Sequence, residues 1–258
     1  MSHGLRLMLR QIGYENRSMR RNPASSFFTA IFPLIFLVVF TTIFGNGEIS
    51  VPGGTTTMAT FYVASIAAYS VINACYTNVA MNVSFAQDLG QLKRLRGTPL
   101  PAWALLGGKI GHAVLVGYLL VVIVTLFGWL FYDVDLPLRT LPALALALTV
   151  GAGAFAAIGL AVAAVVPNAD AAPAVVNGVM LPLTFVSDIF IPMNDAPSWL
   201  TMAANLFPLR HLALAVRTAF NPFEGGYGFE LGHVAVVAAW GLAAAFFAAR
   251  YFRWEPKR

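Results

Sequence analysis

The feature of this sequence that most constrains its fold is a series of long apolar runs that carry almost no charge. A helix needs roughly 20 mostly apolar residues to cross the hydrocarbon core of a bilayer. The runs that meet this requirement are residues 24–44, 61–81, 103–132, 141–166, 171–191 and 234–252. Because lipid offers backbone groups no hydrogen-bond partner, these runs must be helices. The sequence therefore predicts an all-α membrane protein with six transmembrane helices.

Composition supports one membrane domain over residues 1–258. Apolar residues make up 59% of the chain and charged residues only 10%, which is far from the balance of a soluble domain. The first apolar run exceeds the length of a signal-peptide core, and no small-residue cleavage site follows it, so we interpret it as a retained span. The single cysteine, Cys75, cannot form an internal disulfide.

Lysine and arginine cluster by side of the membrane. With residues 24–44 as the first span, all but three of these residues, Arg139, Arg210 and Arg217, fall on the side that holds both termini. The positive-inside rule makes that side cytoplasmic, which requires an even number of spans. Since the basic residues follow topology rather than one patch, the net charge of +5 does not indicate a nucleic-acid partner.

The segment before the first span has the pattern of an amphipathic helix. Leu5, Met8, Leu9 and Ile12 recur at one-face helical spacing, and arginines lie largely on the other faces. We expect residues 1–22 to form an interfacial helix in the cytoplasmic leaflet. A disordered basic leader is the alternative.

Two further segments are too short to be spans. Residues 83–96 place Phe85, Leu89 and Leu92 on one helical face, which predicts a short cytoplasmic helix. A basic loop that only fixes topology is the alternative.

Residues 193–222 contain two short apolar pieces separated at Pro208. These pieces predict an outer re-entrant helical hairpin before the last span, with a plain amphipathic loop as the alternative.

Motifs for catalysis or metal binding are missing from the sequence. The four histidines show no metal-ligand spacing, and no serine lies in a nucleophile-elbow pattern. The run from Gly107 to Ile110 lacks the first glycine and the hydroxyl residue of a phosphate-binding loop. We therefore expect no catalytic residue, metal or cofactor in this chain. If ATP drives the protein, another polypeptide is the ATPase.

Small and ionisable residues within the runs predict how the helices pack. Gly107 and Gly111, together with a stripe at Gly153, Ala157 and Ala161, predict close helix packing. Charge at mid-bilayer is costly, so the ionisable side chains in the runs should face protein, water or headgroups. The long side chain of Lys109 is expected to reach the inner headgroups.

Three stretches, in this order and at these separations, resemble the permease subunits of type-2 ABC exporters. They are the amphipathic segment running into Asn22-Pro23 and residues 32–36, residues 92–99 leading to Trp103, and residues 181–192 followed by 197–200. The second and third are more similar to the daunorubicin-type drug-efflux branch than to the polysaccharide branch.

The resemblance implies a dimer of six-span subunits in the bacterial cytoplasmic (inner) membrane. Two separate ATPase subunits, which would bind ATP and Mg, are then expected to dock beneath it, and a homodimer is the expected arrangement. The resemblance also implies that the helix after the second span is a coupling helix, which contacts the ATPase. Gln87, Asp88 and Gln91 are then expected to be exposed. The coupling residues are Phe85, Gln87, Asp88, Leu89, Gln91 and Leu92.

The same resemblance implies a substrate path between the two subunits, lined by the first, second and fifth spans. Aromatic and amide residues in these otherwise aliphatic helices are the candidates. They are Phe36, Phe40, Tyr69, Asn73, Tyr76, Phe185 and Asp188.

Asp188 stands where the family commonly has glycine, and two interpretations of it are open. It selects a cationic or polar substrate, or it satisfies backbone donors of the outer hairpin or pairs with Arg210.

The predicted function is export of a small amphipathic compound such as a drug or antibiotic. Export of a lipid or glycan by the same machinery is the alternative within the transporter class. From another class, a non-transporting scaffold or signalling subunit would be favoured if no ATPase associates with the chain.

Overall fold

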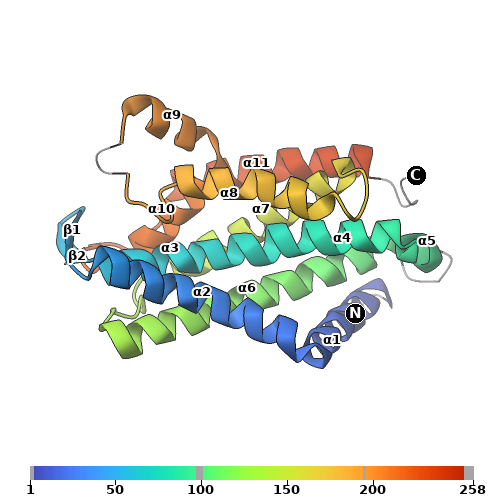
Figure 1. Ribbon diagram of the computed structural model, residues 1–258, viewed down its shortest axis with the longest axis horizontal. Helices are drawn as coiled ribbons and strands as arrows, with labels where there is room; N and C mark the ends of the chain where they lie inside the picture. The colour runs from blue at the N-terminus through green and yellow to red at the C-terminus, as the bar shows by residue number, and fades with distance from the viewer. Residues whose placement is uncertain (1–2, 97–100, 194–195, 253–258) are drawn as a thin grey trace.

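Long helices that alternate in direction make up most of the computed structural model, which describes residues 3–96, 101–193 and 196–252 (Figure 1). Among these residues, five helical stretches are long and apolar enough to cross a membrane, and α8 is a shorter apolar helix. The chain is an all-α membrane protein. Its helices are α1 (His3–Arg21), α2 (Pro23–Phe44), α3 (Met58–Ile72), η1 (Asn73–Thr77), α4 (Asn78–Asp88), α5 (Gln91–Arg96), α6 (Ala102–Tyr132), α7 (Leu141–Val165), α8 (Ala172–Val186), α9 (Ser198–Leu206), α10 (Pro208–Phe220) and α11 (Leu231–Tyr251).

The second span forms the centre of the bundle. Helices α3 and α4 and the π-helical turn η1 between them form one stretch over Met58–Asp88, longer at both ends than the predicted residues 61–81. Thr57 begins it by accepting a hydrogen bond from the backbone N–H of Thr60 at 3.3 Å. In the most apolar part of this stretch 89% of the residues are buried, against 17% in the corresponding parts of α2 and α11, because the other helices pack around it.

The fifth predicted span is shorter than expected. Helix α8 has 15 residues, about 22 Å at 1.5 Å per residue, where residues 171–191 were predicted to span the bilayer. It carries Pro182 in its interior and ends at Val186 with Ser187 as its C-cap, and Asp188 then turns the chain with a φ of 61°. A left-handed residue cannot continue a right-handed helix, so residues 188–191 lie outside it.

A short β-hairpin joins α2 to α3, which an all-α prediction does not include. Strands β1 (Glu48–Val51) and β2 (Gly54–Thr57) pair in antiparallel register, with Val51 opposite Gly54. The two-residue turn depends on Gly53, whose φ of 96° suits glycine.

Helix α1 packs along the start of α6 through glycines. A Cβ at Gly108 would lie 2.5 Å from Gln11 Cβ, and one at Gly111 would lie 2.7 Å from Ile12 Cδ1. The close packing predicted at Gly107 and Gly111 is therefore between these two helices of one subunit. Lys109 does not simply extend to headgroups, because its Nζ lies 2.9 Å from Glu15 Oε1 of α1.

The predicted small-residue stripe of α7 is not its close-packed face. Gly153 is exposed, and nothing lies within 4 Å of a Cβ placed on it. The close approaches are instead at Gly159, where a Cβ would lie 2.8 Å from the carbonyl oxygen of Tyr76, and where Gly241 of α11 meets Ala154.

The segment between α8 and α11 forms two helices, α9 and α10, that meet at Pro208, as the sequence predicted. Helix α10 buries one face, including Leu212 and Val216, and α9 exposes Trp199 and Met202. Figure 1 shows that α1, α5 and the end of α11 lie at one end of the bundle, and that the β-hairpin lies at the other.

Candidate translocation and coupling sites

An aromatic cluster joins α2, α3 and the turn after α8. Phe36 and Phe40 are four residues apart on α2 and therefore share a face. Both rings contact Phe190, with centroids 5.2 and 5.1 Å apart, and Tyr69 of α3 lies 5.2 Å from the same ring. Three predicted path residues thus meet around Phe190, which was not among the predicted path residues. Phe190 lies within residues 181–192, one of the stretches that carry the family resemblance. Its aromatic side chain, five residues after Phe185, was the sequence signal that could have added it to the path residues.

Phe185 lies at the edge of this cluster. Its ring packs edge-on against Phe190 at 5.5 Å, and 51% of the residue is exposed, so it extends the aromatic surface outward from α8. Aromatic rings in such arrangements offer both faces and edges for contact with a planar ligand.

Asn73 and Tyr76 lie on the π-helical turn, one to two turns along the span from Tyr69. The Tyr76 hydroxyl donates to the Val176 carbonyl of α8 at 3.2 Å, and the residue is 2% exposed. Asn73 begins the turn and is half-buried. Tyr76 therefore holds α8 against the central helix, while Asn73 remains the more accessible of the two.

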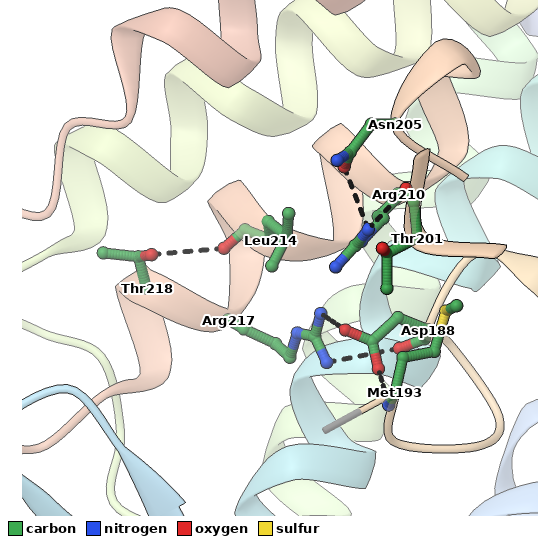
Figure 2. Close-up of polar contacts among 8 residues, drawn as sticks. All are labelled: Asp188, Met193, Thr201, Asn205, Arg210, Leu214, Arg217 and Thr218. Carbon is green, nitrogen blue, oxygen red and sulfur yellow. Dashed lines mark hydrogen bonds and ion pairs between the residues drawn. The ribbon is translucent and has the colours of Figure 1, made fainter. Parts of the chain in front are cut away.

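Asp188 is held by three contacts at the end of α8 (Figure 2). Its Oδ1 accepts from the Met193 backbone N–H at 2.8 Å, and its Oδ2 accepts from Arg217 Nη2 at 2.6 Å. Arg217 also donates to the Asp188 carbonyl at 3.2 Å and lies 4.7 Å from the centre of the Phe61 ring. Both charged side chains are largely buried, at 11% and 15% exposed. The pair ties α8 to α10 and α3.

Arg210, the predicted partner of Asp188, binds elsewhere. Its Nη1 donates to the Thr201 carbonyl at 3.1 Å and to Asn205 Oδ1 at 2.9 Å, joining α10 to α9 (Figure 2). The predicted backbone contact of Asp188 is present, but the predicted arginine is wrong. Arg210 and Arg217 lie seven residues apart, about two turns along one face of α10, so spacing does not choose between them. In the fold, Arg217 packs on the Phe61 ring and reaches Asp188.

The coupling segment is two helices rather than the one predicted over residues 83–96. Helix α4 ends at Asp88, and Gly90, with a φ of 64°, breaks the helical path before α5 begins at Gln91. The Asp88 carboxylate accepts from the Ala169 N–H, at 3.4 Å, in the loop between α7 and α8.

Exposure divides the predicted coupling residues into an exposed and a buried group, and Asp88, which was expected to be exposed, is half-buried between them. Leu89 is 61% exposed and Phe85 is 38% exposed, and Gln91 is also exposed. Gln87, which was expected to be exposed, is 2% exposed, and Leu92 is fully buried, because both point back into the bundle.

A protein-family model described as ABC-2 type transporter matches residues 10–221. This chain belongs to the ABC-2 type transporter family. The matched range runs from α1 to the end of α10, so it includes the aromatic cluster and the coupling segment.

Two relatives align with most of this ABC-2 permease. The inner membrane transport permease YadH of Escherichia coli K12 is 26% identical over 227 residues, which cover 86% of this chain and 84% of the relative. The daunorubicin resistance ABC transporter permease protein DrrB1 of Streptomyces coeruleorubidus is 28% identical over 227 residues, covering 84% of this chain and 74% of the relative. With its apolar helices, the ABC-2 permease is a multi-pass protein of the bacterial inner membrane.

Proposed function

We propose that this ABC-2 permease is the transmembrane half of an exporter for small amphipathic compounds, energised by a separate ATPase subunit that binds ATP and Mg. The observation that carries the proposal is the continuous stretch over α3, η1 and α4. It connects Tyr69 in the aromatic cluster to Leu89 at the exposed end, about 30 Å away at 1.5 Å per residue. A push at Leu89 therefore reaches the cluster through one packed helical element.

The exposed end of this element has the chemistry of a protein contact. Phe85 and Leu89 are four residues apart, so their apolar side chains share one face of the helix end. Exposed Gln91, Lys93 and Arg94 follow them. An apolar pair within a polar rim is typical of interface hot spots, so we assign this surface to the ATPase. Gln87 and Leu92 then support it from inside, and Asp88 holds it to the α7–α8 loop.

The proposed orientation places this end in the cytoplasm together with α1 and the end of α11. The distribution of lysine and arginine supports it, since Lys93 and Arg94 lie at this end and Arg139 lies at the other.

In the proposed path, substrate passes between two copies of the chain along α2, α3 and α8. The rings of Phe36, Phe40, Tyr69 and Phe190 offer stacking and edge contacts to an aromatic or cationic amphipathic compound. DrrB1, which is named for daunorubicin resistance, supports this substrate class. Because Arg217 and Met193 occupy its carboxylate, we assign Asp188 to positioning Phe190 rather than to contacting substrate.

The test is affinity purification of the tagged chain from its native membrane in mild detergent, with mass spectrometry of what accompanies it. A stoichiometric protein with a phosphate-binding loop is expected, and the Phe85→Ala, Leu89→Ala double variant should lose it. Leu138→Ala, which truncates a 73% exposed leucine at the opposite end, is the matched control and should retain it. If no nucleotide-binding protein accompanies the wild-type chain, the ATPase assignment is wrong.

A further inference from the structure

A polar cavity of about 220 Å³ lies between α1, α2, α6 and the η1–α4 part of the central helix. Neither the aromatic cluster nor the coupling surface includes any of its residues. Its polar lining residues include Glu15 of α1, Thr29 of α2, Asn78 and Asn82 of α4, and Lys109 and His112 of α6.

One charge of each sign lines the cavity. Lys109 Nζ and Glu15 Oε1 are 2.9 Å apart, and their side chains are 16% and 19% exposed. Gln11 Nε2 donates to the same Glu15 oxygen at 3.0 Å. An ammonium has three donors. Within the described ranges Lys109 donates to Glu15 alone, so two of its donors remain for a ligand.

Two of the amide side chains in the cavity and its imidazole also have hydrogen-bonding groups to offer a ligand. Among residues 3–96, 101–193 and 196–252, the side chains of Asn78, Asn82 and His112 form no hydrogen bond. Polar groups within membrane spans are costly unless they are partnered. The apolar part of the lining, including Val79 and Val116, is buried. The volume would hold roughly seven waters, or one polar headgroup in their place.

The position of the cavity indicates which ligand can reach it. Lys109 and His112 lie about two and three turns past the start of α6, beside the amphipathic helix α1. An amphipathic helix of this kind lies at the boundary between headgroups and acyl chains. Lipid headgroups are therefore the polar molecules present at this depth.

We propose that the cavity binds the headgroup of an aminophospholipid, a phosphate ester that carries a primary ammonium, from the leaflet in which α1 lies. The phosphate accepts hydrogen bonds from Lys109 and from an N–H of His112. The ammonium donates to Glu15 and to the amide oxygens of Asn78 and Asn82. This site is distinct from the export path and does not depend on which compound is exported.

Charge and donor count give this site its selectivity. A site with one positive and one negative group matches a zwitterion. A trimethylated ammonium has no N–H to donate to Glu15 or the asparagines, and a headgroup without an amine leaves the carboxylate unmatched. Phosphatidylethanolamine should therefore bind in preference to phosphatidylcholine and phosphatidylglycerol.

The experiment equilibrates the purified full-length chain with vesicles of these three lipids in equal amounts and measures retained lipid by native mass spectrometry. Wild type should retain phosphatidylethanolamine at least about tenfold over the other two, the change expected from one hydrogen bond to a charged group. Lys109→Gln and Glu15→Gln should each abolish that preference. Arg10→Gln, which removes an exposed charge on another part of α1, should leave it unchanged.

If these variants destabilise the packing of α1, thermal unfolding of the wild-type chain still tests the proposal. Phosphatidylethanolamine should raise the thermal unfolding midpoint of the wild-type chain, and phosphatidylcholine should not. Equal retention of the three lipids, or a preference that both variants keep, would show that water alone fills the cavity and would overturn the proposal. Displacement of the lipid by soluble phosphoethanolamine at the same concentration would also overturn it, in favour of a free phosphate ester. None of these readouts requires an ATPase, so they fail or succeed separately from the export proposal.

Discussion

The substitution Asp188→Asn isolates the charge of the buried pair that joins α8 to α10. Asparagine tolerates the left-handed backbone at this position and keeps an acceptor for the Met193 N–H. It removes the charge opposite Arg217, whose side chain is only 15% exposed. A hydrogen bond to a charged group contributes about 1.5–3 kcal/mol, so we expect a loss of about 2 kcal/mol in the free energy of unfolding.

Asp188→Ala should cost more than Asp188→Asn. It also loses the backbone acceptor and adds about 1–2 kcal/mol of left-handed strain, which brings the total loss to about 4 kcal/mol. The double variant Asp188→Asn, Arg217→Gln should be less destabilised than the sum of its parts, because it leaves no uncompensated buried charge.

The assay is thermal unfolding of the purified chain in detergent. At about 2–4 °C per kcal/mol for a chain of this size, Asp188→Asn should lower the midpoint by about 4–8 °C. Asp135→Asn, at an exposed aspartate, is the control and should not change it. Equal unfolding midpoints for Asp188→Asn and the control Asp135→Asn would refute the structural role of the pair. Strictly additive effects in the Asp188→Asn, Arg217→Gln double variant would refute it as well.

Three further predictions concern the central helix. Gly159→Ala should lower the unfolding midpoint by several degrees, because its Cβ would lie 2.8 Å from the Tyr76 carbonyl oxygen, whereas Gly153→Ala, in open space, should not lower it. Tyr76→Phe removes the donor to Val176 and should cost about 1 kcal/mol in the same assay. Tyr69→Ala should slow export of an amphipathic dye from cells while ATPase co-purification is unchanged; loss of both would place Tyr69 in the fold rather than in the path.

Sequence patterns predicted the helices well because hydropathy follows directly from the solvent that each segment meets. They predicted α8 less well. Its end depends on Asp188, whose partner Arg217 is 29 residues away, and no local pattern specifies that pair. The turn η1 likewise packs against Gly159 of α7, a contact between distant parts of the sequence. The β-hairpin left a stronger local signal in Gly53 and the threonines that follow it.

Within the candidate sites, residue type was predictable and contact was not. Phe36, Phe40 and Tyr69 could be selected as aromatic exceptions in aliphatic spans, but their meeting point, Phe190, is visible only once α8 has ended and the chain has turned back. Exposure was harder to predict at the coupling segment. The break at Gly90 separates α4 from α5, and Gln87 then lies on the buried face of α4.

In the proposed mechanism, ATPase contact at the end of α4 drives movement of a compound along the aromatic cluster. The measurement that tests it most directly is uptake of a fluorescent amphipathic compound into inside-out vesicles that contain the permease and its co-purified ATPase. Uptake should require hydrolysable ATP, and it should be lost in the Phe85→Ala, Leu89→Ala double variant but kept in Leu138→Ala. Uptake driven by an ion gradient without ATP, or ATP-driven uptake that the double variant retains, would contradict it.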